Sequence, residues 1–141
     1  MVKSLQKSYK AGKVIIACDK GASSYRRNIL PEYKQNRQET RDKQTEQERL
    51  EFEAFFQEFN LALDILKNSG DYPVLQFPGV EADDIAAYIV RKYKKTHTIW
   101  LMSSDKDWDL LIDKNVSSTG CVFFMLFKIE LAKSALRQPR Q

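Results

Sequence analysis

Short apolar strands alternate with helices along this chain, and that alternation restricts the fold more than any other feature. Three runs rich in β-branched or aromatic residues, 14–18, 72–77 and 98–102, have the length and composition of strands. The first and third are apolar throughout, which is typical of strands buried on both faces of a parallel sheet. Amphipathic segments at 45–70 and 81–94 predict intervening helices. The sequence therefore predicts an α/β fold with a mainly parallel central sheet flanked by helices.

The longest predicted helix carries its own start and stop signals. Thr45 to Glu48 matches a capping box, and Gly70 is a typical C-terminal stop. An apolar stripe at helical spacing runs between them: Phe52, Phe55, Phe56, Phe59, Leu63 and Leu66. We expect this stripe to pack in the core and not to stack on bases.

Composition limits the class of protein. The 141 residues suffice for one ordinary domain, and 43% hydrophobic with 30% charged residues is typical of a soluble globular protein. No apolar run approaches the length of a membrane span. Two cysteines, Cys18 and Cys121, are too few for a disulfide framework, so a cytoplasmic, reducing location is expected. Cys18 lies in an apolar run and is expected to fill the core.

A basic, polar segment at residues 20–45 follows the first strand, and we call it the arch-like segment. It has no clean hydrophobic period, and a loop of this length is usually functional or disordered. Between Lys20 and Lys43 it has seven basic residues against three acidic ones, a local excess equal to the net charge of +4 for the whole chain. Such a patch attracts phosphate backbones. Its candidate substrate contacts include Lys20, Arg26 and Arg27.

Carboxylates gather at one predicted edge of the sheet. Parallel strands place their sites at their carboxyl ends, and a helix that starts between two strands also leaves that edge. Six carboxylates can therefore converge there: Asp19, Glu81, Asp83, Asp84, Asp105 and Asp107. Like charges repel unless a cation lies among them, and hard oxygen ligands favour Mg²⁺ or Mn²⁺ over zinc. The sequence thus predicts a metal site.

Two other interpretations stay open on the residues alone. Acidic residues favour helix N-termini and turns, which would explain Glu81, Asp83 and Asp84 but explains less well why Asp19 and Asp105 follow apolar strands. An α/β phosphotransferase or phosphatase could use Asp19 as its nucleophile, although it would not need a basic arch-like segment.

Four motifs, in order, give the chain a resemblance to a known family. They are Asp19-Lys20-Gly21, LPEYKQNR at 30–37, GVEADDIA at 79–86 and SDKDWDLL at 104–111. Together they cover roughly residues 2–117. They closely resemble the 5′–3′ exonuclease and flap endonuclease family, above all the stand-alone phage enzymes and the 5′-nuclease domains of bacterial DNA polymerases.

The resemblance implies a PIN-like domain and a Mg²⁺-dependent nuclease of DNA replication and repair in a bacterial or phage-infected cell. Its substrate would be DNA with 5′ ends, flaps or branches, with RNA in hybrids left open. All six carboxylates would hold metal, two ions in a complete site, with Asp105 and Asp107 also catalytic. Lys34 and Arg37 would lie in a helical arch and contact the scissile phosphate, while Tyr33 would stack on a base.

The chain also departs from that family. The family normally opens with a strand ending in a further metal-ligand aspartate, and continues into Gly-Asp-x-x-Asp-Asn and helix–hairpin–helix segments. We therefore divide the chain into a nuclease core at 1–116 and a divergent tail at 117–141, whose last part (128–141) could form a short basic helix. An alternative follows: a truncated, non-catalytic member that binds branched or single-stranded DNA.

Overall fold

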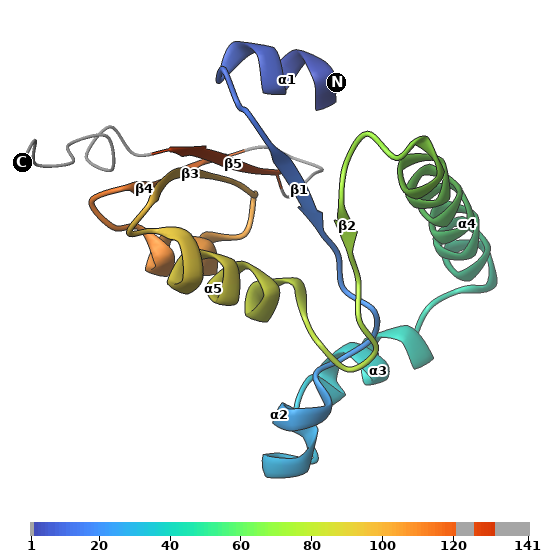
Figure 1. Ribbon diagram of the computed structural model, residues 1–141. Coiled ribbons are helices and arrows are strands. Elements are labelled where there is room, and N and C mark those ends of the chain that lie inside the picture. Colours follow the sequence, from blue (N-terminus) through green and yellow to red (C-terminus); the bar gives the residue numbers. More distant parts are fainter. Residues whose placement is uncertain (1, 121–125, 132–141) are drawn as a thin grey trace, which may run out of the picture.

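The computed structural model describes residues 2–120 and 126–131 and builds them around one sheet (Figure 1). The helices are α1 (Val2–Ser8), α2 (Ser24–Ile29), α3 (Gln35–Asp42), α4 (Glu46–Ser69), α5 (Ala82–Tyr93) and the 3₁₀ helix η1 (Lys106–Leu111). The strands are β1 (Val14–Ala17), β2 (Val74–Leu75), β3 (His97–Met102), β4 (Val116–Thr119) and β5 (Leu126–Leu131).

The sheet has the order β2-β1-β5-β3-β4. The β1–β2 and β3–β4 pairs are parallel, and β5 lies between them, antiparallel to both β1 and β3. Four of the five strands therefore run in one direction, so the carboxyl ends of β1 and β3 lie at the same edge. The predicted α/β fold with a mainly parallel sheet is confirmed.

The strand register sets the heights of the two strand ends. Leu126 of β5 pairs with Ile16 on one side and with Met102 on the other, so these two residues are level across the sheet. Asp19 and Asp105 each follow their level residue by three positions. Because β5 separates the strands, their backbones are two strand spacings apart, or about 10 Å.

Successive residues of β1 point to opposite faces of the sheet and build two cores. Ile15 and Ala17 belong to a cluster with the buried face of α5 and with Trp108 of η1. Val14, Ile16 and Cys18 belong to a cluster on the other face, to which α1, α4 and β2 contribute. The sheet is thus covered on both faces, as the apolar composition of β1 predicts.

The aromatic stripe of α4 is only partly in the core, so that expectation is wrong at its N-terminal half. Leu63 is buried, and Phe59 and Leu66 pack against the second cluster. Phe55 and Phe56 remain 50% and 39% exposed. The capping box at Thr45 and the stop at Gly70 are confirmed. The helix is 24 residues long and extends beyond the sheet, so its first turns have no core to enter (Figure 1).

Two other expectations need correction. The arch-like segment, expected as a loop, contains α2 and α3, whose polar sequences left no apolar period to detect. The expected tail contributes β4 and β5 to the central sheet, so residue 116 is no boundary of the fold, and 128–131 form strand where a helix was expected. The rest of that expected helix, 132–141, lies outside the described residues. Among the described helices, none has the length and apolarity needed to cross a membrane.

Gly79 joins the arch-like segment to the loop before α5. Its amide donates to the carbonyl of Lys20, and its carbonyl accepts from the amide of Ser24. Its φ of +70° is one that residues with a side chain rarely adopt. A Cβ at this position would collide with Ser24 Oγ and would lie 3.0 Å from Ser24 Cβ. The close approach of α2 to the start of α5 therefore requires glycine.

We expect Gly79→Ala to lower the free energy of unfolding by more than the roughly 1–2 kcal/mol of a left-handed alanine alone, because the methyl group also meets Ser24. Gly70→Ala is the matched control, since Gly70 has φ +67° and a methyl group added there would enter open space. Urea unfolding of both variants measures the difference. Equal losses would show that the Ser24 contact is not limiting.

Candidate metal and nucleic acid site

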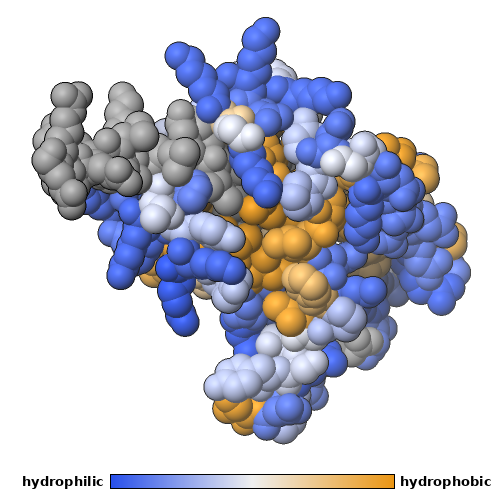
Figure 2. Space-filling view, in the orientation of Figure 1, coloured by the Kyte–Doolittle hydropathy of each residue, from blue (hydrophilic) through white to orange (hydrophobic). Residues whose placement is uncertain are grey.

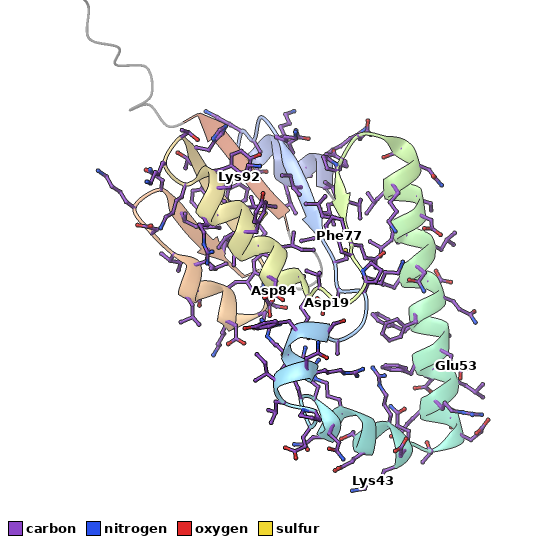
Figure 3. All side chains as sticks on the ribbon, turned by 60° about the horizontal axis from the view of Figure 1, so that its bottom comes forward. Asp19, Lys43, Glu53, Phe77, Asp84 and Lys92 are labelled. Carbon is purple, nitrogen blue, oxygen red and sulfur yellow. The ribbon has the colours of Figure 1, made fainter. Side chains whose placement is uncertain are left out.

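The candidate site lies where β1 and β3 end and α5 begins. Figure 3 shows Asp19 and Asp84 near each other at this edge, with Lys43 and Glu53 farther away along the arch-like segment and α4. Figure 2 shows hydrophobic surface in the middle of the molecule with hydrophilic surface on either side. The residues of the site come from three segments that are far apart in the sequence, at 19–34, 81–84 and 105–107.

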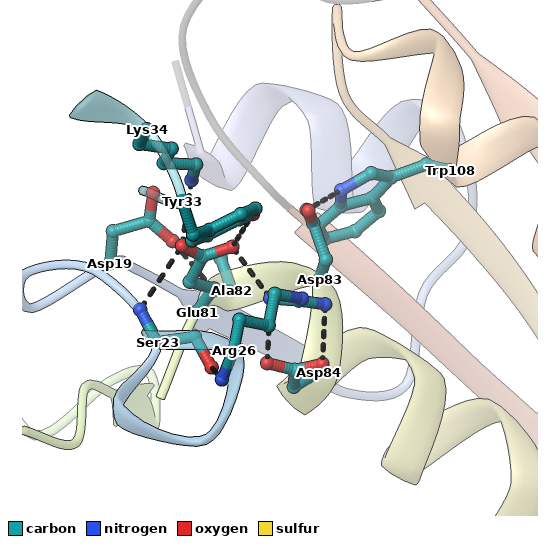
Figure 4. Close-up of polar contacts among 10 residues, drawn as sticks. All are labelled: Asp19, Ser23, Arg26, Tyr33, Lys34, Glu81, Ala82, Asp83, Asp84 and Trp108. Atoms are coloured by element: carbon teal, nitrogen blue, oxygen red, sulfur yellow. Dashed lines mark hydrogen bonds and ion pairs between the residues drawn. The ribbon is translucent and has the colours of Figure 1, made fainter. Parts of the chain in front are cut away.

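Glu81 is the centre of the site. It is 2% exposed, and both carboxylate oxygens are occupied (Figure 4). Oε1 accepts from the Ser23 amide at 3.2 Å and from Lys34 Nζ at 2.6 Å. Oε2 accepts from Arg26 at 2.6 Å and from the Tyr33 hydroxyl at 3.2 Å. A buried carboxylate is stable only with such partners, so Glu81 fixes the arch-like segment to α5.

Arg26 connects Glu81 to a second carboxylate. Its guanidinium makes two hydrogen bonds to Asp84, at 3.1 and 2.9 Å, in a fork that matches the carboxylate geometry. Tyr33 lies between the two cations, its ring centroid 5.8 Å from the Arg26 guanidinium and 5.2 Å from Lys34 Nζ. Arg26, Tyr33 and Lys34 therefore all face carboxylates here. Side chains free to contact a phosphate would face open solvent.

Three aspartates satisfy backbone or indole donors. Asp19 Oδ1 accepts from the Ala82 amide at 2.6 Å and so caps α5, whose own N-cap residue makes no side-chain cap. Asp83 accepts from the buried Trp108 indole N–H at 2.7 Å. Asp105 accepts from the Asp107 amide at 3.0 Å and caps η1. Each is therefore held in a definite place by the start of a helix or by the core.

The raised pKa of Asp83 indicates that negative charge at this edge is not fully compensated. Burial raises that pKa, the hydrogen bond from Trp108 opposes the rise, and the nearby charges of Asp105, Asp19 and Glu81 add to it. Three carboxylates thus repel a fourth that is partly desolvated. A divalent cation at this edge would relieve the repulsion.

The donor set fits a hard divalent metal, because carboxylate oxygens are the ligands that Mg²⁺ and Mn²⁺ prefer. The guanidinium of Arg26 and the ammonium of Lys34 already place positive charge against Glu81 and Asp84. The other four carboxylates, Asp19, Asp83, Asp105 and Asp107, form no ion pair with a basic side chain of the described residues. These four are therefore the carboxylates of this edge that could take a metal ion without displacing a basic side chain.

The carboxylates do not converge as closely as the sequence suggested. No three of them, within the described part of the chain, come together as ready ligands of one ion. One reason is that β5 holds the ends of β1 and β3 about 10 Å apart, and with them Asp19 and Asp105. The shared edge was predicted correctly, whereas the described residues do not show the six carboxylates converging.

A cavity of about 860 Å³ lies between the arch-like segment and α4. The end of β1 forms its floor, including Asp19. Its basic wall includes Arg27, Lys34, Arg37 and Arg41, and its apolar wall includes Phe55, Phe56, Phe59 and Leu63. Among the predicted substrate contacts, Lys20 and Arg26 do not line this cavity, whereas the other four do: Arg27, Tyr33, Lys34 and Arg37. One concave space therefore presents cations and aromatic faces together.

Sequence reasoning missed several of these residues. Ser23 caps α2 and donates its amide to Glu81, and the serine before a basic stretch was the available signal. Trp108 is buried and its indole N–H donates to Asp83. A buried indole N–H needs an acceptor, and that requirement was the available signal for a carboxylate nearby. Phe55 and Phe56 were expected in the core and Arg41 was not singled out, because the residues that line the cavity depend on where α4 lies.

The fold and this acidic edge define a class of protein, the 5′ nucleases. The chain belongs to this family, because residues 1–134 match the model of the 5′–3′ exonuclease N-terminal, resolvase-like domain. The PIN-like fold predicted from the motifs is confirmed with it.

Particular relatives come from phage T5. The chain is 43% identical over 117 residues to the flap endonuclease of Escherichia phage T5, covering 82% of this chain and 40% of that protein. A T5 5′-exonuclease structure with bound zinc ions aligns with TM-score 0.79 and 42% identity, over 84% of this chain and 44% of that one. A T5 flap endonuclease complex with DNA and metal ions aligns with TM-score 0.76 and 41% identity, over 84% and 43%. The chain thus spans less than half the length of these relatives.

Glu81 gives the fold a pH dependence. Burial alone would raise the pKa of Glu81, but the bonds from Lys34, the Ser23 amide and Tyr33 outweigh it and hold the pKa below the ordinary 4.5. Since the folded-state pKa is the lower one, the stabilisation is present above the unfolded-state pKa and is lost as pH falls through the folded-state value.

We expect the free energy of unfolding to decline as pH falls past the ordinary glutamate pKa of 4.5 and through the lower folded-state value, and Glu81→Gln to make that decline shallower. Urea unfolding across this range measures both slopes. Glu53→Gln, at an exposed glutamate of α4, is the control and keeps the full decline. A Glu81→Gln slope equal to that of the original chain would contradict the assigned role of Glu81.

Proposed function

We propose that this chain is the N-terminal catalytic region of a metal-dependent 5′ nuclease that hydrolyses phosphodiester bonds in DNA at 5′ ends, flaps or branches. The observation that carries the proposal is the juxtaposition of the carboxylate edge with the basic, aromatic cavity, which share Asp19 and Lys34. Phosphate chemistry needs metal-binding carboxylates beside a surface that binds the nucleic acid backbone. Family membership and the metal- and DNA-bound T5 structures support the same conclusion.

We assign roles to the chain's own residues. Asp19, Glu81, Asp83, Asp84, Asp105 and Asp107 hold Mg²⁺ or Mn²⁺, two ions in a complete site. Bound there, the metal supplies activation of water and neutralisation of charge on the phosphate. Lys34 and Arg37 neutralise the scissile phosphate from the arch-like segment. We expect this chemistry to serve replication or repair in the cytoplasm of a bacterial or phage-infected cell.

The cavity provides a surface on which a single-stranded substrate can bind. Lys20, Arg26 and Arg27 draw the backbone to the arch-like segment by charge, and Arg37 and Arg41 follow it along the cavity wall. Phe55, Phe56 and Tyr33 offer faces on which bases stack without regard to sequence. The same surface would accept RNA in a hybrid. We propose DNA as the substrate, and cleavage of a flap with an RNA 5′ end is the comparison that tests this choice.

A second candidate function is binding without cleavage. It is favoured by one observation: in the described residues no three carboxylates are gathered as ligands of one ion. Such a chain would hold branched or single-stranded DNA through the cavity alone. The family assignment gives the phosphotransferase alternative no support, and Asp19 is engaged as the cap of α5.

Asp105→Asn tests the nuclease directly. Asparagine keeps an oxygen to cap η1 but loses the charge that would bind metal, so we expect cleavage of an end-labelled 5′-flap duplex to fall on the order of a hundredfold, given that even indirect partners of a ligand cost about 10- to 100-fold. Cleavage is measured with Mg²⁺, with Mn²⁺ and with chelator.

Asp109→Asn, at an exposed aspartate of the same short helix, is the matched control and should cut normally. A flap that is shifted in a gel but never cut by the unaltered chain would support the binding-only alternative.

Phe55→Ala tests the aromatic wall. Loss of one stacking face, worth about 1–3 kcal/mol per base, should weaken binding of a single-stranded oligonucleotide about tenfold or more. Leu61→Ala, at an exposed residue of the same helix outside the cavity lining, should leave affinity unchanged. Fluorescence anisotropy of a labelled oligothymidylate in chelator separates this effect from metal binding. Equal affinities of the two variants would exclude stacking at Phe55.

A further inference from the structure

Two cations of the arch-like segment are bound to carboxylates that we assign to metal. Arg26 contacts Glu81 at 2.6 Å and Asp84 at 2.9 Å, and Lys34 contacts Glu81 at 2.6 Å. The side chains of Arg26 and Lys34 are 32% and 22% exposed, so both are drawn inward from a segment that is otherwise highly exposed. These contacts, with the Tyr33 hydroxyl bond, join the arch-like segment to α5.

The backbone at Lys34 is in a conformation that is unfavourable for a residue with a side chain. Lys34 has φ 63° and ψ 18°, the left-handed conformation, and it stands at the N-cap position of α3 without making a side-chain cap. A residue with a Cβ adopts this conformation at a cost, and the cost must be offset by what the conformation permits. The side chain that leaves this backbone position ends at the buried oxygen of Glu81, to which Lys34 Nζ donates.

A cation cannot share these oxygens freely with another cation. Both oxygens of Glu81 are filled, and both oxygens of Asp84 accept from Arg26. A divalent ion that takes an oxygen of either carboxylate would displace a basic group from it and would repel the group that remained. A divalent metal and the two basic side chains therefore compete for the same oxygens of Glu81 and Asp84.

We propose that Arg26 and Lys34 act as exchangeable counter-ions of the metal site, which they leave when a divalent metal binds. This inference rests on the proposed function, because it takes Glu81 and Asp84 to be metal ligands. The released side chains then belong to a segment held to α5 by fewer contacts, chiefly those of the Ser23 amide and the Tyr33 hydroxyl, beside the cavity that Lys34 already lines. Metal loading thereby loosens the arch-like segment and turns its cations toward a phosphate backbone.

If the exchange occurs, tighter attachment of the arch-like segment to Glu81 and Asp84 lowers the affinity of the site for metal. Weakening the Arg26 contacts removes a competitor for these oxygens and so should strengthen metal binding, because coupling between two equilibria is reciprocal. A purely structural Arg26 would behave differently, since its loss would destabilise the site and weaken metal binding.

Calorimetry with Mn²⁺ on the full chain tests this. We expect Arg26→Ala to bind Mn²⁺ about tenfold more tightly than the original chain, within the range of coupled sites. Arg27→Ala is the matched control, because the neighbouring Arg27 lines the cavity and, within the described residues, forms no ion pair with Glu81 or Asp84. The Mn²⁺ affinity of this control should not change.

A second measurement needs no variant. Mn²⁺ should accelerate cleavage by trypsin after Arg37 and Arg41 of α3 in the original chain, because the released segment is more accessible. Unchanged or weaker Mn²⁺ binding by Arg26→Ala, or protection of α3 from trypsin by Mn²⁺, overturns the exchange.

The result also separates the two proposals. If the original chain binds Mn²⁺ and cuts DNA while Arg26→Ala binds no more tightly, the exchange alone fails. If the original chain binds no Mn²⁺, both the exchange and the metal-dependent nuclease fail.

Discussion

The buried carboxylate of Glu81 is the constraint on which the rest of the site depends. An anion that is 2% exposed requires compensation, and the chain provides it from Ser23, Arg26, Tyr33 and Lys34. These four residues bring a polar, basic segment with no core of its own against the start of α5. The arch-like segment thus owes its position to charge and hydrogen bonding more than to apolar burial.

Much of the fold could be predicted because the signals are local. The apolar run at 14–18 and the periodicity at 82–90 fix a buried strand and an amphipathic helix with little ambiguity. The capping box at Thr45 locates a helix start to the residue. The central place of β5 could not be predicted, since pairing between Leu126 and both Ile16 and Met102 is a long-range choice that no local pattern encodes.

The site was predictable in residue type and edge but not in pairing. Aspartates after apolar strands indicate a shared edge because strand direction follows from fold class. Whether Arg26 faces a phosphate or Asp84 depends on how α2 lies against α5, which rests on single atoms such as the missing Cβ of Gly79. The outward position of Phe55 likewise follows from the length of α4 beyond the sheet. The aromatic stripe in the sequence would look the same whether Phe55 were buried or exposed.

The central position of β5 decides how the two halves of the sheet are held together. Within the described chain, β2–β1 and β3–β4 are two separate ribbons, and hydrogen bonds of β5 are what join them into one sheet. Asp19 belongs to one ribbon and Asp105 to the other. The width of the acidic edge is therefore dictated by a strand that contributes none of the six carboxylates and follows Asp105 in the sequence. A shift of β5 along its neighbours would change the heights of the two aspartates relative to each other, so geometry at the edge is governed from a distant part of the chain.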